Sequence, residues 1–296
     1  MALPPERAAH AELRRRVARR HRLGRVGLYA VAVLAALLTA GPFVWSAITA
    51  FKESRDLYQR DNNPFIYNFN PTLEHVRYLF DNTAFSTFVS NTLWVGLLVV
   101  AITLALGLPA AYSLARLDRP WSGPMGIAIF MVYLVPPTLL FLSLSRIVVE
   151  FGLQDSTWAL VLVYPTITIP VSVWLLIGFL KGIPRDIEEQ AMVDGYSRLG
   201  AFVRTVVPLL FPGVVAVVVF AFTLTASEFI YALTFVSPTA ENVVSTGMPT
   251  ELVRGDVFFW QSLQAATALV AIPIAFVFSL FLERFIAGFT MGAVKG

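Results

Sequence analysis

Long uncharged stretches dominate the chain, and their lengths predict helices that span a membrane. A bilayer-spanning helix needs about 20 predominantly apolar residues. Six runs without Asp, Glu, Lys or Arg are long enough, at residues 26–51, 82–115, 120–145, 156–180, 205–227 and 257–282. The prediction is an all-α, polytopic membrane protein with six transmembrane helices, near 27–50, 91–115, 123–145, 157–180, 209–235 and 262–283.

Two features qualify this pattern. The second run begins with polar residues between Asn82 and Asn91, so we expect its membrane part to start near residue 91. Several spans contain proline, which removes a backbone donor and tends to kink a helix. The prolines of the third and fourth spans indicate irregular helices around a cavity, although kinked packing alone also explains each one: Pro136, Pro137, Pro165 and Pro170.

Composition supports a lipid environment. The 296 residues are 57% hydrophobic and 14% charged, with a mean hydropathy of +0.70. Soluble domains carry roughly 25% charged residues. There is no cysteine, and the three histidines lie apart outside the spans, so we expect no metal site.

The distribution of basic residues predicts the orientation. With the connections assigned alternately, 16 Lys and Arg lie on the side of both termini and 6 on the other side. Short cytoplasmic loops are enriched in basic residues, so both termini are expected in the cytoplasm. The arm 1–25 provides much of this asymmetry. It is also chemically suited to nucleic acid or anionic lipid, but orientation is the simpler role because a span follows directly, and no nucleic-acid partner is expected.

One polar insert interrupts the apolar chain, at "IEEQAMVDGYSRLGAFVRTVVP" (187–208). Pro184 suits the first position of a helix, and the acids after it suit the first turns. Gly195 marks the end of that helix, and Ser197 can cap a second one with an apolar face. The pattern predicts a helix–turn–helix over 184–207 at the cytoplasmic surface, either resting on lipid headgroups or docking to a protein. The outer segment 52–81 is aromatic and polar, which suits an ordered cap or a docking surface.

These residues resemble a known family. "EEQAMVDG" followed by "VVPLLFPG" is similar to the EAA motif of ABC importer permeases, in the carbohydrate-uptake (maltose-type) branch. The family pattern is E-A-A-x-x-D-G and then L-P-x-x-x-P-G. Gln190 departs from the first alanine of this pattern. A second stretch, "ASEFIYAL" (226–233), is similar to the W-N-E-F-x-x-A-L region of the family's fifth span, but it has Ala226 and Ser227 where the family has Trp-Asn. The ending "AGFTMGAVKG" is similar to the tail of the second permease subunit. The matching motif residues are Glu189, Ala191, Asp194, Gly195, Pro208, Pro212 and Gly213.

The resemblance implies a type I ABC importer permease, made of a basic arm (1–25), a permease domain (26–287) and a cytoplasmic tail (288–296). Its partners would be a homologous second permease, two ATPase subunits that bind ATP and Mg, and an extracytoplasmic solute-binding protein that delivers a sugar-like substrate. ATPase closure would act through the coupling helices 184–207, chiefly through Glu188, Glu189, Ala191, Asp194, Gly195, Arg198 and Pro208. The tail would contact the ATPase through Gly292, Val294, Lys295 and Gly296.

The substrate path is predicted around Glu228, a charge inside a predicted span. Intramembrane acids usually face a cavity or a partner. Glu228 could accept hydrogen bonds from a sugar, or it could be a structural acid bonded to nearby hydroxyls. Tyr231, Tyr164 and Asn91 complete the predicted path.

Two other classes of function fit the sequence less well. An intramembrane enzyme needs catalytic groups in the spans, yet there is no G-x-S-x-G, no H-E-x-x-H and no histidine there. A stand-alone carrier would show an internal repeat or more than one intramembrane acid. None of the three lysines lies in a G-K-[ST] sequence, so the chain has no P-loop and is expected to be a transport subunit rather than an enzyme.

Overall fold

The computed structural model describes residues 5–117 and 119–293. Its contacts divide the chain into two compact units, Met1–Leu73 and Glu74–Gly296, named here the N-terminal and C-terminal units. The basic arm thus groups with the first span. The domain boundaries expected at residues 25 and 287 stay predictions.

The N-terminal unit consists of one long helix and a folded loop. Helix α1 (Pro5–Ala50) continues without a break from the arm through the first predicted span. Its apolar part, Gly24–Ala50, has a hydropathy and length sufficient to cross a membrane. Pro42 lies inside the helix, which continues past it. The short helix α2 (Ser54–Tyr58) follows in the loop.

The loop after α1 is held by a buried ion pair. The side chains of Lys52 and Asp56 are both fully buried, with Nζ 3.3 Å from Oδ1. Lys52 also donates to the Asn63 and Ile66 carbonyls. Asn68 donates to Asp56 from its amide side chain at 2.7 Å and from its backbone N–H at 3.0 Å. Every one of these bonds closes the same short loop, so residues 52–68 are ordered by their own side chains; the roles expected for 52–81, an ordered cap or a docking surface, stay predictions.

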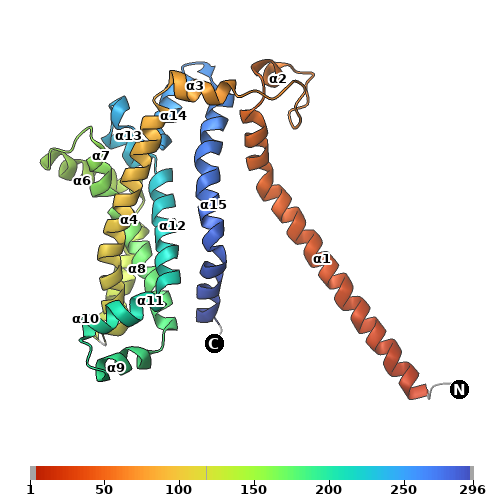
Figure 1. The fold of residues 1–296 in the computed structure, drawn as a ribbon, viewed down its shortest axis with the longest axis vertical. Helices are drawn as coiled ribbons and strands as arrows, with labels where there is room; N and C mark the ends of the chain where they lie inside the picture. Colours follow the sequence, from red (N-terminus) through yellow and green to blue (C-terminus); the bar gives the residue numbers. More distant parts are fainter. Residues whose placement is uncertain (1–4, 118, 294–296) are drawn as a thin grey trace. The chain divides into compact units, whose positions relative to one another are not determined.

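The C-terminal unit is almost entirely helical (Figure 1). Its elements are α3 (Glu74–Asn82), α4 (Phe85–Arg116), α5 (Ser122–Tyr133), α6 (Pro137–Glu150), α7 (Thr157–Val163), α8 (Pro165–Gly182), α9 (Arg185–Val193), α10 (Arg198–Ala201), the π-helical turn η1 (Phe202–Val206), α11 (Val207–Leu209), α12 (Phe211–Ser227), α13 (Ile230–Phe235), the 3₁₀ turn η2 (Thr239–Glu241), α14 (Val244–Leu252), β1 (Val253–Arg254), β2 (Val257–Phe258) and α15 (Trp260–Ala293).

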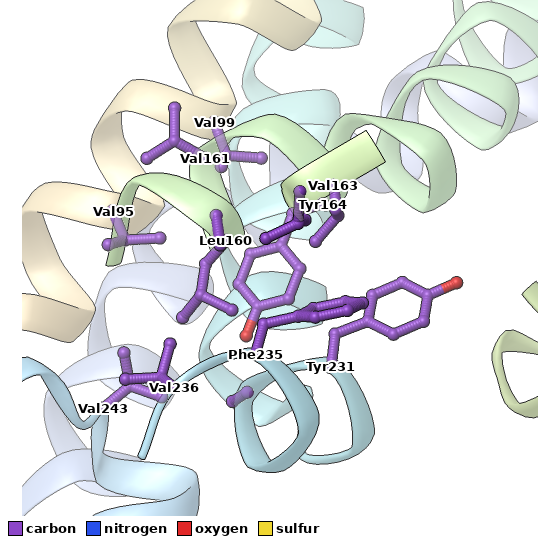
Figure 2. Packing of buried hydrophobic residues seen from close by; sticks show 13 residues of the cluster. Val95, Val99, Leu160, Val161, Val163, Tyr164, Tyr231, Phe235, Val236 and Val243 are labelled. Atoms are coloured by element: carbon purple, nitrogen blue, oxygen red, sulfur yellow. The ribbon is translucent and has the colours of Figure 1, made fainter. Parts of the chain in front are cut away.

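Three helices form the centre of this unit. Helix α4 packs most extensively against α8, and α12 packs against both. Two apolar clusters lie along them. One joins α4, α7 and α13, and Figure 2 shows its Val95, Val99, Leu160 and Tyr164 side chains. The other joins the far ends of α4 and α8 to η1 through Tyr112, Leu180 and Phe202 among others.

The two ends of the C-terminal unit differ. One end holds α9, α10 and α11 together with the last residues of α15, and the other holds α3, α13 and α14 (Figure 1). Helix α4 runs from the second end to the first. Its Asn91 bonds to the carbonyls of Ala240 and Asn242, and its Arg116 bonds to Ile183. Helix α4 begins at Phe85 and so includes most of the polar start of the second run, while the start of its membrane part near residue 91 stays a prediction. Within the helix the Thr92 hydroxyl donates to the Phe88 carbonyl, so a polar side chain is accommodated there without ending the helix.

Four helical segments are long and apolar enough to cross a membrane singly: Gly24–Ala50, Phe85–Arg116, Thr157–Gly182 and Trp260–Phe281. They correspond to the first, second, fourth and sixth predicted spans. The third and fifth are bent pairs, so the count reaches six only when each pair forms one span.

The bends lie at breaks that the sequence marks only in part. Helices α5 and α6 meet at 94° next to Pro136 and Pro137, where the missing backbone donors end one helix and start the next. The segment 198–209 meets α12 at 74°. The predicted fifth span, 209–235, is further interrupted at Glu228 and Phe229, between α12 and α13. The chain therefore forms no continuous helix over residues 123–145 or 209–235.

Candidate functional site

The polar insert folds as two short helices joined by a tight turn. Helix α9 begins at Arg185, with Pro184 as its N-cap rather than its first residue. At its end the Gly195 N–H donates to the Met192 carbonyl, and the Tyr196 N–H donates to the Ala191 carbonyl, both at 3.1 Å. This pair of bonds is a Schellman motif, in which the residue after the cap adopts a left-handed conformation. Gly195 has φ +97°, a value that glycine adopts without strain.

The second helix starts as the sequence indicates and continues differently. The Ser197 hydroxyl accepts from the Gly200 N–H at 3.1 Å, so it caps α10. The π-helical turn η1 then inserts an extra residue per turn and rotates the following side chains. Phe202, Val206 and Leu210 are buried, but Val203 is 53% exposed, although regular helical spacing places it on the same face.

Exposed apolar side chains lie in both short helices of this segment and in the turn between them. Val193 is 86% exposed and Leu199 is 70% exposed, and Tyr196 is also exposed. Among the predicted coupling residues, Glu189, Asp194, Gly195, Arg198 and Pro208 are exposed, and Ala191 is buried. We name the surface formed by Ile187, Val193, Tyr196 and Leu199 the outer face.

Glu188 points the other way, toward α4. Its residue is 6% exposed, and it accepts a hydrogen bond from the Tyr112 hydroxyl. Its Oε2 lies 3.5 Å from Arg116 Nε, an ion-pair distance at which Nε makes no hydrogen bond. Arg116 donates through Nη2 to the Ile183 carbonyl at 2.8 Å. Sequence analysis missed Tyr112 and Arg116. Their spacing of four residues, which places them on one face at the end of an apolar run, is the signal that could have found them.

The predicted tail lies mostly outside the described residues, which end at residue 293. Gly292 falls in the last turn of α15, and Val294, Lys295 and Gly296 fall beyond it. The end of α15 lies at the same end of the C-terminal unit as α9 (Figure 1).

Glu228 occupies the break between α12 and α13. Its carboxylate accepts hydrogen bonds from the backbone N–H groups of Ile230, Tyr231 and Ala232, at 2.9–3.2 Å. These are unpaired donors of the first turn of α13, so the carboxylate caps that helix. The sequence also allowed a structural acid bonded to the hydroxyls of Thr223, Thr225 or Ser227. Among the described residues, the Glu228 carboxylate accepts no hydrogen bond from these hydroxyls. Its backbone N–H donates to the Thr225 carbonyl at 3.4 Å.

The other predicted path residues lie in the same half of the molecule. Tyr164 and Tyr231 are fully buried, and their hydroxyls have no hydrogen-bond partner of good geometry among the residues that the structure describes. The Tyr164 hydroxyl lies beside the Glu228 carboxylate without hydrogen-bond geometry. In Figure 2 the rings of Tyr164, Phe235 and Tyr231 lie next to one another. Asn91 is already committed to the carbonyls of Ala240 and Asn242.

A cavity of about 450 Å³ lies nearby and is lined almost wholly by apolar side chains. None of the predicted path residues lines it. Its walls come from α3, α4, α12, α14 and α15, with Phe80, Val89, Phe222, Val270 and Ile274 among the lining residues. A sugar needs hydrogen-bond partners, so this cavity does not match a sugar path. In the described part of the chain, no group of three or more metal-ligating side chains is present.

The fold defines a polytopic helical membrane protein with a pair of short helices, α9 and α10, at one end of its C-terminal unit. A family model described as "Binding-protein-dependent transport system inner membrane component" matches residues 103–290. The chain belongs to this family. It is a permease component of an ABC importer located in the inner membrane, and therefore a transport subunit rather than the ATP-hydrolysing one.

Similar proteins span nearly the whole chain. The sulfoquinovosyl glycerol transport system permease protein SmoH of Agrobacterium fabrum is 33% identical over 86% of this chain and 88% of its own length. The diacetylchitobiose uptake system permease protein DasC of Streptomyces coelicolor is 31% identical over 94% of this chain and 100% of its own. Among solved structures, a bacterial ABC transporter involved in the import of the acidic polysaccharide alginate contains a chain with the same fold. It is 15% identical, with a TM-score of 0.75 over 90% of this chain and 98% of that one.

Proposed function

We propose that this chain forms one half of the translocation path of a sugar importer and that the α9–α11 segment transmits ATPase movement to it. The supporting observation is the outer face: exposed apolar side chains on a rigid turn, at one end of a membrane protein that has no P-loop. Exposed apolar groups rimmed by charge are typical of protein-binding surfaces. Glu189 lies on the exposed side and would meet a basic group of the ATPase.

The relatives support a sugar-like substrate. Their names specify a sulfoquinovosyl glycerol, a diacetylchitobiose and a trehalose/maltose system. The proposed assembly contains a homologous second permease, two ATPase subunits that bind ATP and Mg, and an extracytoplasmic binding protein. A solved relative of this fold contains a substrate-bound periplasmic protein.

The proposed topology has six spans with both termini in the cytoplasm. Arg116 contacts Ile183 at the α9 end, whereas Thr157 bonds to Glu241 at the opposite end, near Asn91. The bent pair α5–α6, between these points, therefore starts at one end and finishes at the other. The C-terminal tail would reach the ATPase because α15 ends on the α9 side.

The proposed path runs past the break at Glu228, close to Tyr164 and Tyr231. A broken helix leaves backbone groups available at membrane depth, which is tolerated where they line a cavity or are satisfied by protein. Asn91 would shape the outer end of this path by holding the 240–242 segment.

The docking role is tested by placing a charge on the outer face. Val193→Asp and Leu199→Asp alter exposed side chains, so the fold should persist while co-purification of the ATPase and substrate uptake are lost. Val257→Asp, also at an exposed position but at the other end of the C-terminal unit, is the control. Normal ATPase co-purification by both outer-face variants would contradict the proposal.

A further inference from the structure

Three polar side chains are buried together where α9 meets α4. The Arg116 and Glu188 side chains are 7% and 8% exposed, and Tyr112 is 8% exposed. Tyr112 and Arg116 lie one helical turn apart on α4 and reach the same carboxylate, one by a hydrogen bond and one by charge. The other acids of α9, Asp186 and Glu189, are exposed.

Further contacts attach both short helices to the same end of α4. Arg116 bonds to the Ile183 carbonyl just before α9, and Arg185 reaches the Ala115 carbonyl at 3.5 Å. The Tyr112 ring packs against Phe202 of η1, with ring centroids 4.3 Å apart. Tyr112 therefore contacts α9 with its hydroxyl and the second helix with its ring.

The covalent connections alone would leave α9 free to pivot. Its only link to α8 is Ile183 and Pro184, both extended, with ψ values of 122° and 138°. On its other side a four-residue turn leads to α10. A buried carboxylate is tolerated only while its partners stay in place, because separating them leaves an uncompensated charge away from water. Sliding α9 along α4 would break the hydrogen bond and the ion pair together.

We propose that Tyr112, Arg116 and Glu188 form a rigid joint that makes α9 and the adjoining half of α4 move as one body. Glu188 is then a positioning residue, which acts on the membrane helices from inside, whereas the outer face meets the partner. Movement applied to α9 is transmitted to α4 through this joint. The same movement is transmitted to α8 and α12 through the covalent chain. That functional consequence rests on the proposed coupling role, but the joint itself does not.

The joint is tested first in the isolated chain. The sequence has no cysteine, so Leu106→Cys on α4 and Val193→Cys on α9, both exposed, give a unique pair of spin labels. A narrow distance distribution is expected with Tyr112, Arg116 and Glu188 intact, and a broad one after Tyr112→Phe with Glu188→Gln. A distribution of unchanged width in that variant would overturn the proposal. If the double variant does not fold, Tyr112→Phe alone decides, because it keeps the ring against Phe202.

The second test uses the reconstituted transporter with its ATPase and binding protein. Glu188→Gln and Tyr112→Phe should still co-purify with the ATPase and hydrolyse ATP, but the substrate transported per ATP should fall roughly tenfold, within the usual range of coupling between sites. Glu150→Gln and Tyr133→Phe make the same chemical changes at exposed positions and serve as controls. Transport per ATP equal to the controls would overturn the joint's role in coupling. Failure of the wild-type chain to bind any ATPase would instead contradict the proposed function and leave the spin-label result to decide the joint.

Discussion

At the scale of single residues, glutamates cap helix starts at the end of the C-terminal unit away from α9. Glu228 accepts from the first turn of α13, Glu241 from the Thr157 N–H at 2.8 Å, and Glu251 from the Ala84 N–H at 3.1 Å. A carboxylate at a helix N-terminus satisfies unpaired donors and complements the helix dipole. These acids hold the starts of α13, α7 and α4 in place at that end.

This arrangement predicts a stability defect for Glu228 variants. Glu228→Ala removes the acceptor for three backbone donors and should lower the free energy of unfolding by about 1–3 kcal/mol. Glu228→Gln keeps one acceptor oxygen and should lower it less. Thermal unfolding in detergent measures both. A variant with unchanged unfolding temperature and a raised KM for uptake would show a sugar ligand instead of a cap.

At the scale of elements, the loop after α1 depends on Asp56. Burial alone would raise the pKa of Asp56, but the hydrogen bonds from Asn68 and Lys52, with the charge of Lys52, together lower that pKa below its usual value. A carboxyl whose folded pKa is depressed stabilises the fold above its unfolded pKa, and the contribution is lost as pH falls through the folded pKa. The loop is therefore stable at neutral and mildly acidic pH.

The corresponding prediction concerns hydrogen exchange of the 51–72 segment. Protection of the Asn68 N–H should persist from pH 7 to pH 5 and disappear only below about pH 4, near the ordinary pKa of an aspartate. Asp56→Asn should remove protection at pH 7, because it removes the carboxylate that pairs with the buried Lys52 ammonium and accepts from Asn68, at a cost of about 3 kcal/mol. Asp61→Asn, at an exposed position, is the control. Full protection in Asp56→Asn would refute the role of the ion pair.

The turn between α9 and α10 is an element that local sequence specifies almost completely. Gly195 supplies the left-handed backbone, Ser197 supplies the cap, and both act on their near neighbours. The π-helical turn after it has no such signature, and Val203 within that turn is exposed rather than buried.

At the scale of the whole molecule, the alternating arrangement predicts which ends face which compartment. In cells that express the chain without its ATPase subunits, which would cover the outer face, cysteine at Val193 should react with a membrane-impermeant maleimide only after permeabilisation, whereas cysteine at Val257 should react in intact cells. Both side chains are exposed, and the chain has no cysteine of its own to interfere. The reverse labelling pattern would mean that the proposed orientation is inverted. Equal labelling of both sites would mean that residues 193 and 257 lie on the same side of the membrane, against the proposed topology.

The sequence by itself determined that this is an integral membrane protein, roughly where its apolar helices lie, that the insert forms a capped helical pair, and which family the chain belongs to. These features arise from local composition, from backbone preferences of proline and glycine, and from motif spacing, all of which are readable along one chain. Even the unusual insert at 187–208 carried its own turn signals.

Only the tertiary structure decided where the side chains of that insert point and how the spans bend. Glu188 and Glu189 are adjacent in sequence and chemically alike, yet one is buried against Tyr112 and Arg116 and the other is exposed. That choice depends on a helix more than 70 residues away. Likewise, Glu228 caps α13 because the chain breaks there. Both outcomes follow from long-range packing and from the need of every buried charge and backbone donor to find a partner, which no local pattern specifies.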